Sequence, residues 1–144
     1  MAPSLHPNHF FKNYGYPGWN GFTKEDELFL INKEAQIEKY LSELPIFEYK
    51  SNVSVNRHFI SVVSQYYLDY VTIYLRECFP AADAIFIHNP KTDAIYVRRG
   101  KNSITDVSIF AKAYLDGDGN HFAAKGKATP TWTNRFIPNF KQIN

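Results

Sequence analysis

The sequence predicts an α+β fold in which two helices pack on one face of a four-stranded antiparallel β-meander, with aromatic N- and C-terminal arms. The hydrophobic pattern repeats about every 3.6 residues between residues 23 and 79, and every two residues between residues 83 and 129. With 44% hydrophobic and 21% charged residues, the 144-residue chain has the composition of a globular protein. We expect a single domain over residues 1–144.

The N-terminal arm, residues 1–22, combines Gly and Pro with aromatic residues. Gly and Pro prevent a long helix or strand here. The many rings favour a segment that lies across the folded body, and a ligand-gripping loop is the alternative. Thr23 then resembles an N-cap, and the acidic residues 25–27 favour the first turn of a helix. This amphipathic helix is predicted to end near Leu44, because Pro45 follows.

Residues 57–79 are predicted to form a buried central helix, which follows a polar link at residues 51–56. Val, Ile and Tyr in this stretch favour strands, but strict alternation fails across residues 61–70 and a helical polar stripe holds throughout. Residues 23–79 are therefore interpreted as the helical part of the domain. The polar stripe consists of Ser61, Gln65, Asp69, Thr72 and Arg76.

Residues 83–129 are predicted to form the antiparallel sheet. Turn-forming residues separate four alternating segments, and short turns join antiparallel neighbours. The tail at residues 130–144, which contains Trp132, has neither period and is expected to return over the body as a strap. The predicted strands are residues 83–88, 94–99, 105–115 and 120–129.

Alternation within these strands divides the side chains between two faces. One face is apolar in every strand and is expected to pack on the helices. The other face has four cations, two histidines and four rings, and no carboxylate, whereas a merely solvated face mixes both signs of charge. A solvated face partly covered by the strap remains the alternative. The basic face comprises Phe86, His88, Tyr96, Arg98, Phe110, Lys112, Tyr114, His121, Lys125 and Lys127.

Basic residues interleaved with rings suit a surface that holds phosphates and stacks bases. We expect His88, or alternatively His121, to act as a general base, and Arg98, Lys112 and Lys125 to stabilise the charge on a phosphorane. His88 and these three cations are predicted to converge on one catalytic patch. The residues expected to bind nucleic acid around it are Tyr96, Phe110, Tyr114, His121 and Lys127.

The distribution of charge also favours an anionic partner. Residues 1–87 carry seven Lys and Arg against ten Asp and Glu, whereas residues 88–144 carry nine against four. No metal or other cofactor is expected, because the five histidines lack metal-site spacing and a single cysteine cannot form a zinc site. Residues 116–120 resemble the start of a calcium loop, but Lys127 occupies the position of the required acid.

The chain shows neither a signal peptide at its start nor an apolar run long enough to span a membrane. Its one cysteine, Cys78, allows no internal disulfide and fits a reducing compartment. We therefore expect a cytoplasmic protein without membrane contact, or one delivered into a target cell if it is a toxin. No sequence feature indicates an oligomeric state.

Two stretches, residues 12–41 and 85–102, resemble the tRNA-cleaving domain of colicin D and related metal-free RNase toxins. They contain a Lys, Tyr and Gly-rich leader, an acidic amphipathic helix, and a basic hairpin around residues 89–92. The resemblance implies helices packed on a small antiparallel sheet and RNA as the ligand. The family's catalytic histidine follows the lysines of the leader, and no histidine follows Lys12 there; His9 is the nearest.

The leading functional hypothesis is an RNA-binding domain that could extend to metal-free ribonuclease activity of the bacterial toxin type, with tRNA as one substrate. A second hypothesis is a non-enzymatic immunity, phage or accessory protein whose basic face binds an acidic protein partner. A third is a small-molecule pocket between a curved sheet and the helices, as in folds related to nuclear transport factor 2.

Overall fold

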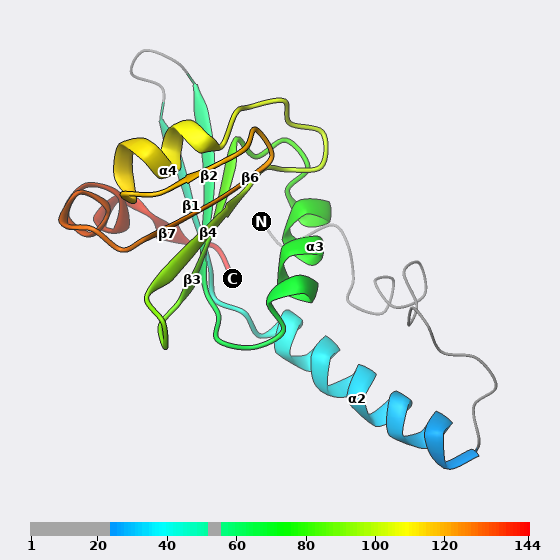
Figure 1. Cartoon of the computed structure of the whole chain (residues 1–144). Helices are drawn as coiled ribbons and strands as arrows, with labels where there is room; N and C mark the ends of the chain where they lie inside the picture. The colour runs from blue at the N-terminus through cyan, green and yellow to red at the C-terminus, as the bar shows by residue number, and fades with distance from the viewer. Residues whose placement is uncertain (1–23, 52–55) are drawn as a thin grey trace.

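A seven-stranded mixed sheet forms the centre of the part of the chain that the structure describes (Figure 1). The computed structural model describes residues 24–51 and 56–144, so the expected arm at residues 1–22 and the expected N-cap Thr23 lie outside the described residues. Within them, the α-helices are α2 (Lys24–Ser42), α3 (Leu68–Cys78) and α4 (Ser108–Tyr114), and two short helical turns are η1 (Trp132–Phe136) and η2 (Ile137–Asn139). The strands are β1 (Ile46–Ser51), β2 (Arg57–Val63), β3 (Ala84–Asn89), β4 (Ala94–Arg98), β5 (Asp118–Gly119), β6 (Ala123–Lys127) and β7 (Lys141–Gln142).

The strands lie in the order β5-β6-β4-β3-β2-β1-β7. Every neighbouring pair is antiparallel except β2 and β3, which are parallel. Parallel neighbours need a crossover, and α3 provides it between β2 and β3. The α+β class is therefore confirmed, but the sheet is larger than the predicted four-stranded meander and includes a parallel pair.

The predicted continuous helix over residues 57–79 is wrong in its first half. Residues 57–63 form β2, and α3 begins only after Tyr67, whose φ of 55° breaks any continuous helix. In β2, Phe59 and Ile60 are buried on opposite faces of the sheet. A strand buried on both faces is apolar in nearly every position, so its sequence lacks alternation. Strand propensity was therefore the better guide here.

The predicted strand over residues 105–115 is also wrong, because residues 108–114 form α4. The Asp106 carboxylate begins this helix by accepting hydrogen bonds from the Ser108 N–H and hydroxyl at 3.0 and 2.6 Å. The buried positions Val107, Phe110 and Ala111 follow a helical period. The predicted strand over residues 120–129 is confirmed as the shorter β6, which pairs with the two-residue β5.

Helical segments cover both faces of the sheet rather than one (Figure 1). The end of α2 and all of α3 cover the first face, called the α3 face below, where Leu41, Ile60 and Leu75 belong to one apolar cluster. On the opposite face, the α4 face, α4 packs with the C-terminal segment 132–140. The core of this layer contains Phe86 and Trp132, whose ring centroids lie 4.5 Å apart. The expected C-terminal strap therefore contributes the buried Trp132 and the partly buried Phe136 and Phe140 to this layer.

Candidate nucleic-acid surface

The register of the β3–β4 hairpin decides which side chains share a face. Ile85 pairs with Arg98 and Ile87 pairs with Tyr96. Directly opposed residues of antiparallel strands project to the same face. Tyr96 and Arg98 therefore lie on the α3 face, whereas His88 lies on the α4 face. The prediction that His88 and Arg98 share one face is wrong.

The length of the hairpin loop explains this difference. Asn89 and Ala94 form the last pair of the ladder, and the four residues between them make the turn. This closure pairs odd-numbered residues of β3 with even-numbered residues of β4. The prediction instead placed even-numbered residues of both strands on the same face. A shift of one residue in the pairing moves all the side chains of one strand to the other face of the sheet.

His88 has a local partner in the hairpin. Its Nε2 lies 2.7 Å from the Asp93 carboxylate, and Asp93 has a left-handed backbone with φ of 61°. The contact joins the end of β3 to the turn that follows it. The structure therefore separates His88 from Arg98 and Lys125, and it places Lys112 on α4 instead of on a strand. The predicted catalytic patch is not formed, and a catalytic role for any of these residues stays a prediction.

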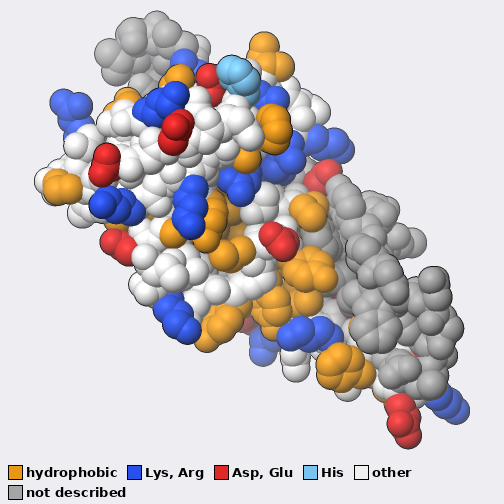
Figure 2. Space-filling model, in the orientation of Figure 1, with side chains coloured by type: hydrophobic (Ala, Val, Ile, Leu, Met, Phe, Trp, Pro, Cys, Tyr) orange, Lys and Arg blue, Asp and Glu red, His pale blue; other side chains and the backbone are white. Residues whose placement is uncertain are grey.

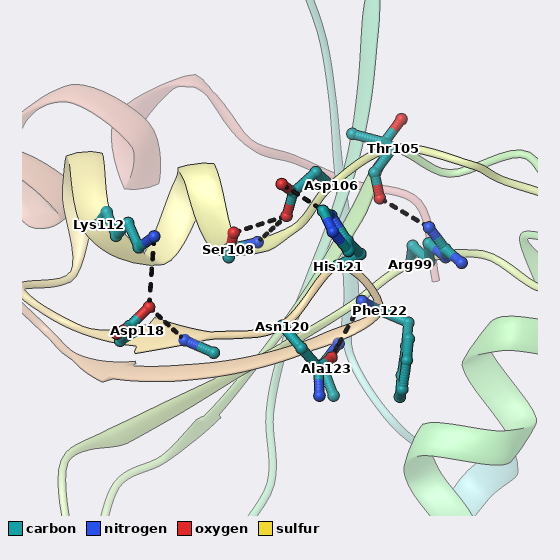
Figure 3. A network of polar contacts seen from close by, with 11 residues as sticks. Arg99, Thr105, Asp106, Ser108, Lys112, Asp118, Asn120, His121, Phe122 and Ala123 are labelled. Carbon is teal, nitrogen blue, oxygen red and sulfur yellow. Dashed lines mark hydrogen bonds and ion pairs between the residues drawn. The ribbon is translucent and has the colours of Figure 1, made fainter.

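Lys112, His121 and Lys127 each lie beside a carboxylate. Lys112 Nζ lies 3.5 Å from Asp118, as Figure 3 shows, and Lys127 Nζ lies 3.8 Å from Asp116. Backbone N–H donation from Gly119 and the Lys112 charge lower the pKa of Asp118. These acids lie in the segment between α4 and β6, Asp116 before β5 and Asp118 within it, and the prediction placed this segment outside the basic face.

His121 contacts Asp106 at the start of α4. His121 Nδ1 lies 3.0 Å from Asp106 Oδ2 (Figure 3). The hydrogen bond from Ser108 is the main cause that lowers the pKa of Asp106, and the nearby His121 lowers it further. His121 thus connects the segment before β6 to the start of α4, and its predicted contact with nucleic acid stays a prediction.

Phe110 and Tyr114 belong to the α4 face and not to the surface of Tyr96. Phe110 is 5% exposed and its ring centroid lies 5.2 Å from that of Phe59. Tyr114 packs edge-on against Phe136 at 4.4 Å. Both residues are on α4, so the prediction of a strand in this segment assigned them to the wrong element.

The structure does bring together three of the predicted residues, Tyr96, Arg98 and Lys125. Tyr96 of β4 pairs directly with Lys125 of β6, on the α3 face. Lys125 Nζ lies 5.3 Å from the centre of the Tyr96 ring, and the Arg98 guanidinium carbon lies 6.0 Å from it. The three side chains line a shallow hollow of about 240 Å³, with Asp118 also in its lining.

Arg76 is a member of this site that sequence analysis missed. It lies in the last turn of α3, and its Nε donates a hydrogen bond to the Arg99 carbonyl oxygen at 2.8 Å. Burial lowers the pKa of Arg98, and the Arg76 charge lowers it further. The sequence identified Arg76 only as a member of the polar stripe of a helix. Which residues that stripe contacts depends on how α3 crosses the sheet, and the sequence does not show this.

We call Arg76, Tyr96, Arg98 and Lys125 together the Tyr96 surface. In Figure 2, a band of Lys and Arg side chains crosses the visible face of the molecule beside hydrophobic side chains. Among the described residues, the ion pairs involve other cations and none of Arg76, Arg98 and Lys125. Asp69 partly offsets the charge, since its carboxylate raises the pKa of Arg98. The surface nevertheless concentrates positive charge around one ring.

The described residues contain no group of three or more His, Cys, Asp or Glu side chains arranged to hold a metal ion. None of the helices in the described ranges is both long enough and apolar enough to cross a membrane.

Comparisons with known proteins add little to this site. No family model matches the chain, and no curated protein matches it. Among solved structures, it is similar to an uncharacterized protein from Helicobacter pylori G27, with a TM-score of 0.45 and 14% sequence identity. The match covers 77% of this chain and 29% of that chain, so this chain spans less than a third of that protein's length. Function must therefore be inferred from the side chains themselves.

Proposed function

We propose that the chain binds single-stranded RNA through the Tyr96 surface. The observation that carries the proposal is the position of two cations over one half-buried ring, since Lys125 Nζ and the Arg98 guanidinium carbon lie 5.3 and 6.0 Å from the centre of the Tyr96 ring. Like charges held together repel each other, and a bound anion would relieve that repulsion. Phosphate oxygens accept hydrogen bonds from guanidinium groups, and the ring of Tyr96 offers a stacking partner for a base.

The shape of the surface favours a polymer that crosses it. The hollow beside Tyr96 is shallow and is lined by residues of β4, β5 and β6, the three strands at one end of the sheet. A shallow surface leaves both ends of a strand of nucleic acid free to continue, whereas a small molecule is usually enclosed. Lys125 and Arg98 flank the ring, so phosphates on either side of a stacked base could each meet a cation.

The proposal concerns binding and does not extend to cleavage. The base expected from the sequence, His88, lies on the opposite face of the sheet and contacts Asp93. A general base must lie within hydrogen-bond reach of the proton it removes. Ribonuclease activity at the Tyr96 surface would therefore need a base other than His88.

The first experiment measures binding of a fluorescein-labelled single-stranded RNA by anisotropy across a salt series. Three phosphate contacts predict a slope of about −2 for log K against log salt, so affinity should fall roughly tenfold to twentyfold between about 50 and 200 mM salt. The double variant Arg98→Glu with Lys125→Glu should abolish this binding. The matched control reverses Lys91 and Lys141, which are exposed on the hairpin turn and on β7. Equal losses in the two double variants would contradict the proposal.

The second experiment separates RNA from an acidic protein partner. Tyr96→Leu keeps the apolar bulk but removes the aromatic ring, so it should weaken RNA binding by an amount typical of a lost base stack, roughly 1–3 kcal/mol. Polyglutamate should compete poorly with the RNA, because it cannot stack. If polyglutamate competes as well as unlabelled RNA and Tyr96→Leu binds normally, the surface recognises charge alone and the acidic-partner hypothesis is favoured.

A further inference from the structure

A second hollow lies on the α4 face, away from the Tyr96 surface. It has a volume of about 430 Å³ and is lined by residues from β1, β2, α4 and the C-terminal segment. This volume falls within the range of small-molecule sites, which is roughly 300–1,000 Å³. We call it the aromatic pocket, and the residues that characterise it are Tyr49, Arg57, Phe59, Phe110, Tyr114 and Phe136.

Five of the nine residues that line this pocket are aromatic. Tyr49 stacks on Phe59 with nearly parallel planes and ring centroids 5.9 Å apart. Phe136 meets Tyr49 edge-on at 6.2 Å and Tyr114 edge-on at 4.4 Å. Because these rings contact one another, they form a pre-organised aromatic wall. Such a wall favours a flat aromatic guest, which can stack on one ring and meet another edge-on.

The pocket contains one charged side chain among the described residues that line it, Arg57. Its guanidinium carbon lies 5.6 Å from the centre of the Phe110 ring, so the cation is held over the aromatic wall. Asp83 anchors it from one side, with Oδ1 at 3.5 Å from Arg57 Nη1. Asp83 already accepts a hydrogen bond from Thr105 at that same oxygen, at 2.6 Å. A guanidinium has five N–H donors, so Arg57 retains donors for an anion in the pocket.

We infer that the aromatic pocket binds a small planar aromatic carboxylate. The ring of the guest packs among Tyr49, Tyr114 and Phe136, and its carboxylate accepts hydrogen bonds from Arg57. Arginine suits this role because its planar fork matches the two oxygens of a carboxylate. The site is independent of the Tyr96 surface, since the sheet lies between them.

The test uses the full chain and 2-naphthoate as the probe. Trp19→Phe leaves Trp132 as the one tryptophan in the chain. Trp132 stacks on Phe136, with ring centroids 5.5 Å apart, so its indole N–H resonance reports on the pocket by NMR. We expect a saturable shift of this resonance with 2-naphthoate. The uncharged 2-naphthalenemethanol and the non-aromatic cyclohexanecarboxylate should each bind at least about tenfold more weakly, because each lacks one of the two interactions.

Two variants locate the binding. Arg57→Gln should weaken 2-naphthoate binding about tenfold or more, since a charge-assisted hydrogen bond is lost. Ala113→Trp fills the pocket from an exposed position on α4 and should abolish binding. Its matched control is Ala81→Trp, at an exposed turn after α3, which should bind normally. If Arg57→Gln unfolds, the comparison of 2-naphthoate with the alcohol still tests the charge in the folded protein.

Three results would overturn the inference. They are the absence of a saturable shift up to the solubility limit of 2-naphthoate, equal affinity for the carboxylate and the alcohol, and equal binding by Ala113→Trp and Ala81→Trp. RNA binding should be unchanged in Ala113→Trp, so failure of this inference can be distinguished from failure of the RNA-binding proposal.

Discussion

Replacing Arg76 with Gln tests the Tyr96 surface one charge at a time. Gln keeps an N–H donor for the Arg99 carbonyl oxygen but removes the positive charge beside Arg98. For single-stranded RNA, each phosphate contact contributes about 0.7 to the slope of log K against log salt. At roughly 0.1 M salt, losing one contact should therefore weaken RNA binding about fivefold and reduce the slope by about 0.7. Stability should hardly change, because removing one of two like charges relieves repulsion.

The assay is an anisotropy titration of single-stranded RNA at several salt concentrations, together with urea denaturation of each variant. Lys141→Gln serves as the matched control, because Lys141 is exposed on β7 at the opposite edge of the sheet from β5 and β6. The control should keep both the affinity and the slope. An Arg76→Gln variant that keeps the wild-type slope, or that loses no more affinity than Lys141→Gln, would refute the assignment of Arg76 to the RNA surface.

Three further predictions test the fold around the sites. Trp132→Ala should lower the free energy of unfolding in urea by about 3–5 kcal/mol, since the ring is 1% exposed and packs on Phe86; a loss near zero would contradict its core position. Asp106→Asn should flatten the pH dependence of the Tm below about pH 4. Because the pKa of Asp106 is lowered in the folded protein, its stabilising effect is present above the unfolded-state pKa and is lost as pH falls through the folded-state pKa. Identical profiles of Tm against pH for the wild type and Asp106→Asn would contradict this assignment. His88→Ala should leave RNA affinity unchanged, and a large loss in the anisotropy titration would place His88 at the RNA site.

Sequence patterns predicted the parts of the fold that local chemistry determines. The β3–β4 hairpin is bounded by turn-forming residues, and its two strands match the predicted segments closely. The amphipathic pattern of α2 and the proline after it likewise located a helix that ends at Ser42. In each case the residues that start or stop the element lie within it or beside it, so no information about distant contacts was needed.

The errors arose where burial on two sides removed the periodic signal. β2 lies inside the sheet with both faces covered, so Phe59 and Ile60 are both buried and the strand shows no alternation. In α4 a helix was mistaken for a strand, because Ile109, Ala111 and Leu115 also fit a period of two. Only contacts with distant residues distinguish these cases, since Phe110 packs against Phe59 of β2 and Phe86 of β3. The Tyr96 surface was thus partly predictable, whereas Arg76 depended on the crossover of α3.

The hairpin loop is the feature that links fold and proposed function. Its closing pair, Asn89 and Ala94, places Arg98 on the α3 face beside Arg76. The alternative register would turn Arg98 onto the α4 face, where Phe86 and Trp132 are fully buried. An unpaired guanidinium in an apolar cluster loses its hydration, at an effective cost of several kcal/mol. The apolar layer of the α4 face therefore excludes the alternative register, and the same constraint concentrates the cations around Tyr96.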